Sequence, residues 1–461
     1  MQRFWPGLLC TASLLLAASG LDLISADSLR KNVTWLAADE RQGRMTPSPG
    51  LSASAEYIAT QFRLAGLVPA GERGTFFQTA TLQQITPDNA GFQMTLSAGG
   101  RKIALQPESV GVSSIRSLQF QDVGTVRVRG PGPLPSMTGR VVVASDAWEA
   151  PAMFHSLELR KPALILLVMG GEKSADANTL LDAQAAKVPV VRVYGRAASD
   201  LLAASGEMRL TLRMTAPASR SVQVRNVAGL LVGDDIDVRD QYVIVSAHYD
   251  HLGVKPPGPG NRIFHGANDD ASGVASLIEI AKALKGETPR PRRSVLFLAL
   301  FGEEEGMLGS DYYVRHPLVP LRDTIADINL EQLGRTDSSD GAEVGRFAFT
   351  GPSFSNLPQK MASSAKTAGV AVYRKESADD YFDRSDNYAF AEAGIVAHTV
   401  VVAFEYPGYH EVNDTADQLD YRNLAKVDRA LAAGIEGVAN AAEKPKWADT
   451  VATAIYRNAA R

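Results

Sequence analysis

The stretch from Phe297 to Ser310, FLALFGEEEGMLGS, constrains the fold of this chain more than any other. Its apolar part, Val295–Phe301, has the length and composition of a β-strand buried on both faces, as in a parallel sheet. The strand ends abruptly in Glu303, Glu304 and Glu305. Three carboxylates at the end of a buried strand repel one another unless a cation holds them, and a divalent metal ion is the simplest such cation. Because ligands collect beyond the carboxyl ends of strands in open α/β sheets, we expect a metal site there.

From Asn226 onward, strand-like and helix-like segments alternate. This pattern predicts an α/β fold with a mostly parallel mixed sheet that is covered by helices on both faces. The expected strands are Tyr242–Ser246, Val295–Phe301, Ile325–Leu330 and Ile395–Val402. The expected helices are Ser28–Ala38, Ser52–Gly66, Ser272–Leu284, Ser355–Ala368, Asn387–Ala393 and Leu424–Ala442.

Between about Thr79 and Leu212 the sequence changes to short alternating runs that are typical of β-strands, with one helix expected at Thr179–Ala186. We interpret residues 113–215 as a smaller β-rich domain inserted into the main one. The alternative is that this segment continues the main sheet. The predicted layout is a signal peptide over 1–26, the N-terminal part of the main domain over 27–112, the insertion over 113–215, the rest of the main domain over 216–445 and a tail helix over 446–461.

Residues 1–26 have the organisation of a secretory signal peptide. Arg3 precedes the apolar core Leu8–Ala18, and small residues follow at Ala17–Gly20 and again at Ser25–Ala26, so that cleavage at either cluster fits. The alternative is an uncleaved membrane anchor, for which the apolar core is short. We therefore predict an exported protein, periplasmic or extracellular, that has no membrane association after cleavage.

Composition excludes some partners and one kind of cross-link. The net charge is −4, so the chain lacks the excess of basic residues that would favour binding to nucleic acid or to an acidic membrane surface. The only cysteine, Cys10, lies within the predicted signal peptide, so disulfides do not hold the mature fold. The sequence makes no prediction about the oligomeric state.

Histidine or carboxylate residues also follow the other predicted strands. The candidate metal ligands are His248, Asp269, Glu304, Glu331 and His410. Nitrogen and carboxylate ligands without thiolate suit zinc, with manganese or cobalt as alternatives. Because a carboxylate has two oxygens, Asp269 could bridge two ions. Each ion would then have one histidine, one terminal carboxylate and an open position for water.

Glu303 is the candidate general base. Side chains of successive residues diverge, so Glu304 can bind metal while Glu303 faces the water. We expect Asp250 to accept the ring N–H of His248 and fix its tautomer, and Asp414 to do the same for His410.

Each of these residues has a structural interpretation when taken alone. Asp269 and Asp270 at a helix start would make a good N-cap, and Glu303–Glu305 could be a solvated acidic turn. The metal prediction depends on their coincidence at the ends of successive sheet elements. His251 and His265 are predicted to lie outside the ligand set.

With these residues in place, the sequence resembles the co-catalytic dizinc aminopeptidase family, whose relatives include aminopeptidase Y, glutamate carboxypeptidase, transferrin receptor and the glutaminyl cyclases. The matching segments are SAHYDHLG at 246–253, GANDDASG at 266–273, FGEEEGMLGS at 301–310, INLEQLGR at 328–335 and YHEVNDT at 409–415. In addition, LAADERQGR at 36–44 resembles the leader of these enzymes, and the 113–215 insertion resembles a protease-associated domain.

The resemblance implies two overlapping metal sets. One consists of His248, Asp269 and Glu331, the other of Asp269, Glu304 and His410, with Glu303 as the base. The family often has aspartate where this chain has Glu331, which leaves open whether two zinc ions or one are bound. Asn387 stands where some relatives have histidine, and we assign it no role.

The leading hypothesis is an exported zinc-dependent aminopeptidase that acts on peptides with a free N-terminus. Tyr409 and Arg384 are candidates for substrate contact, as stabilisers of the oxyanion, with packing and surface charge as the alternative. The competing hypotheses are a carboxypeptidase or a glutaminyl cyclase on the same fold, or a non-catalytic, receptor-like member.

Overall fold

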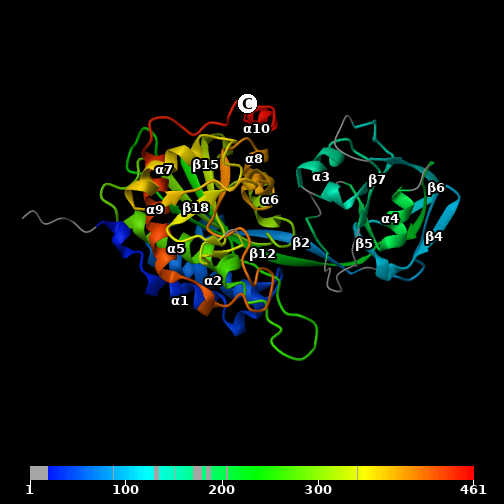
Figure 1. Ribbon diagram of the computed structural model, residues 1–461, viewed down its shortest axis with the longest axis horizontal. Helices are drawn as coiled ribbons and strands as arrows, with labels where there is room; N and C mark the ends of the chain where they lie inside the picture. Colours follow the sequence, from blue (N-terminus) through cyan, green and yellow to red (C-terminus); the bar gives the residue numbers. More distant parts are fainter. Residues whose placement is uncertain are drawn as a thin grey trace, which may run out of the picture.

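The computed structural model describes residues 19–460 except 87, 129–133, 150, 170–178, 183–187, 204–205 and 340. The signal-peptide prediction for residues 1–18 lies outside the described residues. The described chain forms two large sheets, which Figure 1 shows as separate units connected through β2 (Phe77–Thr86) and β12 (Ala218–Leu231).

The larger sheet has the strand order β19-β18-β20-β15-β13-β14-β12-β2-β9, and β1 also pairs with β12. Its four central strands pair parallel with one another. The flanking strands pair antiparallel with their neighbours, except that β19 pairs parallel with β18. The four central strands are β20 (Ala397–Val401), β15 (Thr324–Leu330), β13 (Tyr242–His248) and β14 (Ser294–Leu300). The others are β1 (Val68–Pro69), β9 (Thr179–Leu181), β18 (Arg346–Phe349) and β19 (Ala371–Val372). The predicted mixed α/β sheet is confirmed.

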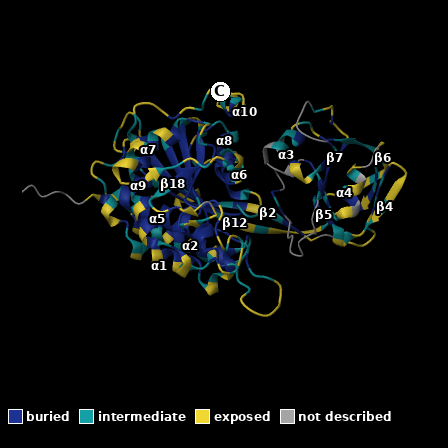
Figure 2. Cartoon of the chain, in the orientation of Figure 1, coloured by how far each residue is buried: buried dark blue, intermediate teal, exposed yellow. Residues whose placement is uncertain are grey.

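Helices cover both faces of this sheet, which explains why every residue of β14 and β15 is buried. Val243 and Val245 point to one helical layer, whereas Ile244 points to the other. The first layer contains α1 (Ala26–Leu36), α2 (Pro49–Leu64), α5 (Ser272–Gly286), α7 (Leu357–Thr367) and α9 (Tyr421–Asn440). The second contains α6 (Leu308–Arg315), α8 (Asn387–Glu392) and α10 (Ala454–Ala459). Figure 2 shows the strands buried between helices whose outer faces are exposed.

The smaller unit is a sheet with the strand order β4-β3-β11-β6-β7-β8-β10-β5 and its own apolar cores. Its strands are β3 (Gln93–Ala98), β4 (Arg101–Leu105), β5 (Val110–Ser113), β6 (Leu118–Arg127), β7 (Val141–Ser145), β8 (Leu164–Met169), β10 (Val190–Tyr194) and β11 (Arg209–Met214). Its helices are α3 (Pro151–Glu158) and α4 (Arg196–Ala203).

Two sequence-based expectations differ from this architecture. The boundary expected at residue 113 is too late, because β3, β4 and β5 pair within the second sheet. The helix expected at Thr179–Ala186 is wrong in its described part, because Thr179–Leu181 forms β9 and pairs with the edge of β2. Residues 183–187 lie outside the described part. A strand's alternation carries no information about which sheet it joins, and a three-residue strand has too few residues to show a period.

The C-terminal helix is shorter than the expected 446–461. Only Ala454–Ala459 is helical, and Tyr456 packs into the core beside α8. Trp447 lies before the helix and packs against the same core.

Among the described residues, no helix combines the length and the apolar composition needed to cross a bilayer.

Candidate metal centre

The candidate ligands come together at the carboxyl ends of adjacent strands. His248 is the last residue of β13, Glu303 and Glu304 follow β14, and Glu331 directly follows β15. His410 lies in the loop after β20. Because β14, β13, β15 and β20 are neighbours and run parallel, their ends meet at one edge of the sheet.

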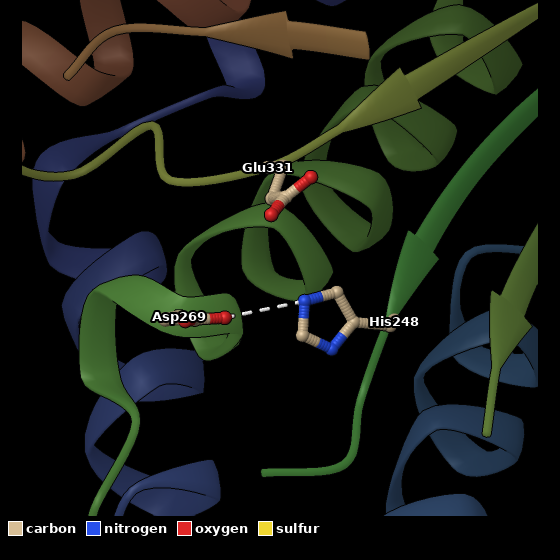
Figure 3. Close-up of side chains that lie close together, drawn as sticks. All are labelled: His248, Asp269 and Glu331. Carbon is tan, nitrogen blue, oxygen red and sulfur yellow. Dashed lines mark ion pairs between the residues drawn. The ribbon is translucent and has the colours of Figure 1, made fainter. Parts of the chain in front are cut away.

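Asp269 lies between two histidines. Its Oδ1 is 3.2 Å from His248 Nε2, and its Oδ2 is 3.2 Å from His410 Nε2. Figure 3 shows the Asp269 carboxylate directed at the His248 ring, with Glu331 beside them. Two donor atoms bound to one tetrahedral zinc ion are about 3.3 Å apart, since each bond is about 2.0–2.1 Å long. Asp269 therefore has the spacing of a carboxylate that bridges two ions.

The turn before α5 separates the roles of two adjacent aspartates. Asp270 Oδ1 accepts the N–H of Gly273 at 2.9 Å, in the first turn of the helix. Asp270 thus stabilises the helix start, as the structural interpretation of this pair predicted. Asp269 instead faces the histidines.

The residues His248, Asp269 and Glu331 fit a divalent cation. Each offers one ligand atom, and these atoms lie within 4.8 Å of one another. The His248 side chain is fully buried, and neither of its ring nitrogens has a hydrogen-bond partner among the described residues. Burying a ring nitrogen without a hydrogen-bond partner costs free energy of folding. A metal ion bound to the Nε2 of His248 would remove that cost.

Glu304 belongs to a second group of potential ligands. Its Oε2 lies 3.4 Å from His410 Nε2, and its Oε1 lies 2.7 Å from His251 Nδ1. Ligand atoms of His251, Asp269 and Glu304 also lie within 4.8 Å of one another. His251 is predicted from the sequence to lie outside the ligand set, and the structure places it in buried contact with Glu304, a member of that set. Its position three residues after His248 is the only signal in the sequence.

Asp250 connects His248 to the segment that carries Glu303. Its Oδ1 lies 3.6 Å from His248 Nδ1 and accepts the backbone N–H of Glu303 at 3.1 Å. Its Oδ2 accepts the hydroxyl of Thr46 at 3.2 Å. Asp250 is therefore on the side of the His248 ring where the sequence analysis expected it.

Asp414 does not contact His410 as expected. Its carboxylate accepts the backbone N–H groups of Asn268, at 3.0 and 3.1 Å, and of Asp269, at 3.1 Å. The Tyr406 hydroxyl donates to it as well, at 3.1 Å. The expectation was wrong because the loop places Asp414 behind the turn, where it holds the backbone of Asp269 instead of the ring of His410.

Arg44 holds the loops around the candidate metal centre, and it was not among the residues predicted from the sequence. Its fully buried guanidinium donates to the carbonyls of Tyr249 (2.9 Å), Leu36 (2.7 Å), His265 (2.8 Å) and Gly266 (2.8 Å). It thereby ties the loop after His248 to the turn before Asp269. The only sequence signal was its position in the LAADERQGR segment.

The electrostatics of the cluster call for a cation. Burial, and then the charges of Glu331 and Glu304, raise the pKa of Glu303 well above its usual range. Burial and the nearby Asp269 raise the pKa of Glu304 to about 8, and burial raises the pKa of Glu331. A divalent ion favours the ionised form of a carboxylate and would lower all three pKa values.

A pocket of about 110 Å³ opens onto these groups. Its lining includes Asp269, Glu303, Glu331 and His410, together with Val401, Phe404, Tyr381, Glu405, Arg384 and Tyr409. Tyr409 stacks on His410 with ring centroids 4.0 Å apart, and the exposed Arg384 lies 4.6 Å from the centre of the Tyr381 ring. Among the described residues of the second sheet, none lines this pocket.

The parallel centre of this sheet gathers histidines and carboxylates at its strand ends, and these side chains could hold a divalent metal ion. Residues 226–435, a little under half of the chain, match the model of peptidase family M28.

Sequence relatives agree with this assignment. Aminopeptidase YwaD of Bacillus subtilis (strain 168) is 26% identical over 262 residues, which are 56% of this chain and 53% of that protein. A probable zinc metalloprotease of Pyricularia oryzae is 36% identical over 119 residues, 24% of this chain and 22% of that protein. The chain thus matches about half, or less, of the length of these curated relatives.

Solved structures confirm the fold. The aminopeptidase from Aneurinibacillus sp. strain AM-1 aligns with a TM-score of 0.54 at 18% identity, over 90% of this chain and 94% of that one.

Proposed function

We propose that this chain, whose residues 226–435 match peptidase family M28, is a zinc-dependent aminopeptidase that hydrolyses the first peptide bond of peptides with a free N-terminus. The observation that carries the proposal is the Asp269 carboxylate, which has His248 at 3.2 Å from one oxygen and His410 at 3.2 Å from the other. Glu303 lines the same pocket. This combination supplies a metal-binding centre and a base on one wall.

Two overlapping sets of residues would hold zinc. His248, Asp269 and Glu331 would hold one ion, and Asp269, Glu304 and His410 the other. Asp250, 3.6 Å from His248 Nδ1, would fix the ring orientation. Zinc bound there supplies Lewis acidity to the scissile carbonyl and makes water easier to deprotonate.

Glu303 is the proposed general base. Its backbone N–H is held by Asp250, and its neighbour Glu304 faces the two histidines His251 and His410. Glu303 would take the proton of the attacking water as the new C–O bond forms. It would return that proton to the amine nitrogen as the C–N bond breaks, so the carboxylate is regenerated at the end of the cycle.

The rest of the pocket suits the substrate's α-amine and the oxyanion. Glu331 and Glu405 make this part of the lining acidic, which favours a cationic amine. Tyr409 and Arg384 border the same pocket and are the proposed contacts of the developing oxyanion.

The remaining parts of the proposal concern location and the second sheet. The pattern of residues 1–26 supports export to the periplasm or the medium. The second sheet, which follows β2 and precedes β12 in the chain, is proposed to be an inserted, protease-associated-like domain.

The test is release of p-nitroaniline from a panel of aminoacyl-p-nitroanilides by purified protein. Cleavage should stop with chelator, return with zinc and be absent on N-acetylated substrates. Glu303→Gln should lower kcat by about 10²–10⁴-fold, because the water loses its proton acceptor, while zinc content stays the same. Glu305→Gln is the matched control. Full turnover by Glu303→Gln would contradict the assigned base, and zinc-loaded protein without cleavage would contradict the aminopeptidase.

One observation favours carboxypeptidase activity as a second candidate. Arg384 is an exposed cation in the pocket lining, and a guanidinium is suited to binding a substrate's terminal carboxylate. Cleavage of N-acetylated dipeptides with a free carboxylate, lost in Arg384→Gln, would favour this activity over the aminopeptidase.

A further inference from the structure

We propose that His251 is a positioning residue that orients Glu304 and thereby sets how tightly the second zinc ion is held. The inference rests on the proposed zinc centre and concerns the ion that Asp269, Glu304 and His410 would share. It goes beyond that centre because His251 itself would not bind the metal.

The contacts of Glu304 divide between its two oxygens. Oε1 lies 2.7 Å from His251 Nδ1, and Oε2 lies 3.4 Å from His410 Nε2. When Glu304 is ionised, the His251 ring nitrogen donates to Oε1. A carboxylate that is held by a donor on one oxygen presents the other oxygen in a fixed direction. That direction is toward His410, whose Nε2 also lies 3.2 Å from Asp269 Oδ2.

The distances distinguish a hydrogen bond from shared metal ligation. Two donors on one tetrahedral zinc ion are about 3.3 Å apart. The separations of His410 from Asp269 and Glu304, 3.2 and 3.4 Å, match this spacing. The His251–Glu304 separation of 2.7 Å is shorter and is that of a charge-assisted hydrogen bond. His251 therefore acts on the ion through Glu304.

The His251 ring is confined on several sides. Its side chain is fully buried, and a Cβ added at Gly266 would lie 2.5 Å from its Cγ and Cδ2. The edges of Phe264 and His410 pack against it, with centroids 6.5 and 5.8 Å away. A ring wedged in this way has little freedom to turn from Glu304, which is what a positioning group requires.

The test measures zinc binding directly, by metal content after dialysis and by competition with a chromophoric chelator. His251→Leu removes the donor and keeps an apolar side chain of similar size. His251→Asn keeps an N–H near the Nδ1 position. His265→Asn is the matched control, since His265 is a neighbouring histidine that pairs with Asp39 at 2.9 Å and not with a ligand candidate.

We expect His251→Leu to lower the affinity for the second zinc ion about 10- to 100-fold and to leave the affinity for the first ion unchanged. Losses of this size are typical when the hydrogen-bond partner of a metal ligand is removed. The zinc affinity of His251→Asn should lie within a few-fold of the wild-type value, and the zinc affinity of His265→Asn should equal the wild-type value. In a His410→Ala background, where the second ion is already lost, His251→Leu should have no further effect.

Four results would overturn the inference. One is a His251→Leu variant whose affinity for both zinc ions is unchanged. Another is a His251→Leu variant that loses affinity for both ions equally. A third is a loss in His251→Asn as large as in His251→Leu, which would show that the donor is irrelevant. Wild-type protein that binds no zinc would instead refute the proposed metal centre, and the inference with it. Circular dichroism and the unfolding midpoint of each metal-free variant separate a loss of ligand orientation from a loss of fold.

Discussion

At the scale of single residues, the buried guanidinium of Arg44 connects the loops that position His248 and Asp269. Its four backbone acceptors include the carbonyls of Tyr249 and Gly266, which lie one residue after His248 and three residues before Asp269. Lysine keeps the charge but cannot reproduce a fork of donors. We therefore expect the hydrogen-bond geometry of the guanidinium, and not its positive charge alone, to hold these two loops together.

We predict that Arg44→Lys lowers the free energy of unfolding by about 2–4 kcal/mol, because several buried carbonyls lose their donors. Urea unfolding of the metal-free protein measures this change. Arg63→Lys, an exposed arginine on α2, is the control and should change stability little. An Arg44→Lys variant as stable as wild type would mean that charge, and not the hydrogen-bond geometry, holds these loops.

Asp428 on α9, which lies outside the metal centre, should make the stability of the protein depend on pH. Burial, together with the nearby Glu279, raises the pKa of this fully buried carboxyl well above its usual range. The folded state therefore keeps a proton that the unfolded state releases above about pH 4, so stability falls as pH rises from there toward the folded-state pKa.

Asparagine at position 428 has no proton to release. We expect Asp428→Asn to unfold at a higher temperature than wild type at pH 8, with the difference shrinking to nothing near pH 4. Thermal unfolding across this pH range is the measurement, and Asp240→Asn, an exposed aspartate, is the control. A difference that grows toward low pH would show that Asp428 is ionised in the folded protein.

At the scale of elements, the segment before α1 packs against the end of α5. Gly20–Leu23 forms a 3₁₀-helix, and the hydroxyl of Ser19 and the N–H of Leu21 both donate to Glu287, at 2.6 and 3.2 Å. Ser25 caps α1 in a reciprocal box with Ser28. Cleavage at the Ser25–Ala26 cluster would remove both features, whereas cleavage before Ser19 would leave them in the mature chain.

We predict that Gly20→Ala destabilises the protein by about 1–3 kcal/mol, because there is no space for a methyl group. A Cβ at this position would lie 2.2 Å from the carbonyl oxygen of Ala283. Gly258→Ala is the control, since the nearest atom to its Cβ lies 3.8 Å away. An unchanged unfolding midpoint, together with a mature N-terminus at Asp27, would place cleavage at the later cluster.

At the scale of the whole molecule, the second sheet is connected to the first through two paired strands. Thr86 of β2 lies opposite Ala218 of β12, and between these positions β9 returns to pair with the edge of β2. The metal-site strands are β13, β14, β15 and β20, all of which follow the second sheet in sequence. Removing the second sheet therefore also removes β9, a three-residue strand at the edge of β2.

Replacing residues 87–217 with an Asn-Gly turn should give a folded, zinc-binding chain, because this dipeptide closes a two-residue hairpin. Since none of the described residues of the second sheet lines the pocket, kcat/KM for aminoacyl-p-nitroanilides should change less than about tenfold, a barrier change of about 1.4 kcal/mol. Zinc content, circular dichroism and turnover are the measurements. A folded, zinc-loaded short chain without turnover would show that the second sheet takes part in the reaction.

The sequence by itself determined the main-sheet strands at the centre of the fold and the residue types at their ends. Apolar runs, caps and turn residues are local signals, and the carboxyl ends of adjacent parallel strands always meet. His248, Glu304 and Glu331 could therefore be expected at one edge before any coordinate was known.

Only the tertiary structure decided which side chains touch. It placed His251 on Glu304, turned Asp414 toward the backbone of Asp269 and inserted Arg44 between two loops. It also assigned the strands of residues 93–113 to the second sheet. These outcomes depend on the distances between segments far apart in the chain and on side-chain directions, and a one-dimensional pattern of apolar and polar residues contains neither.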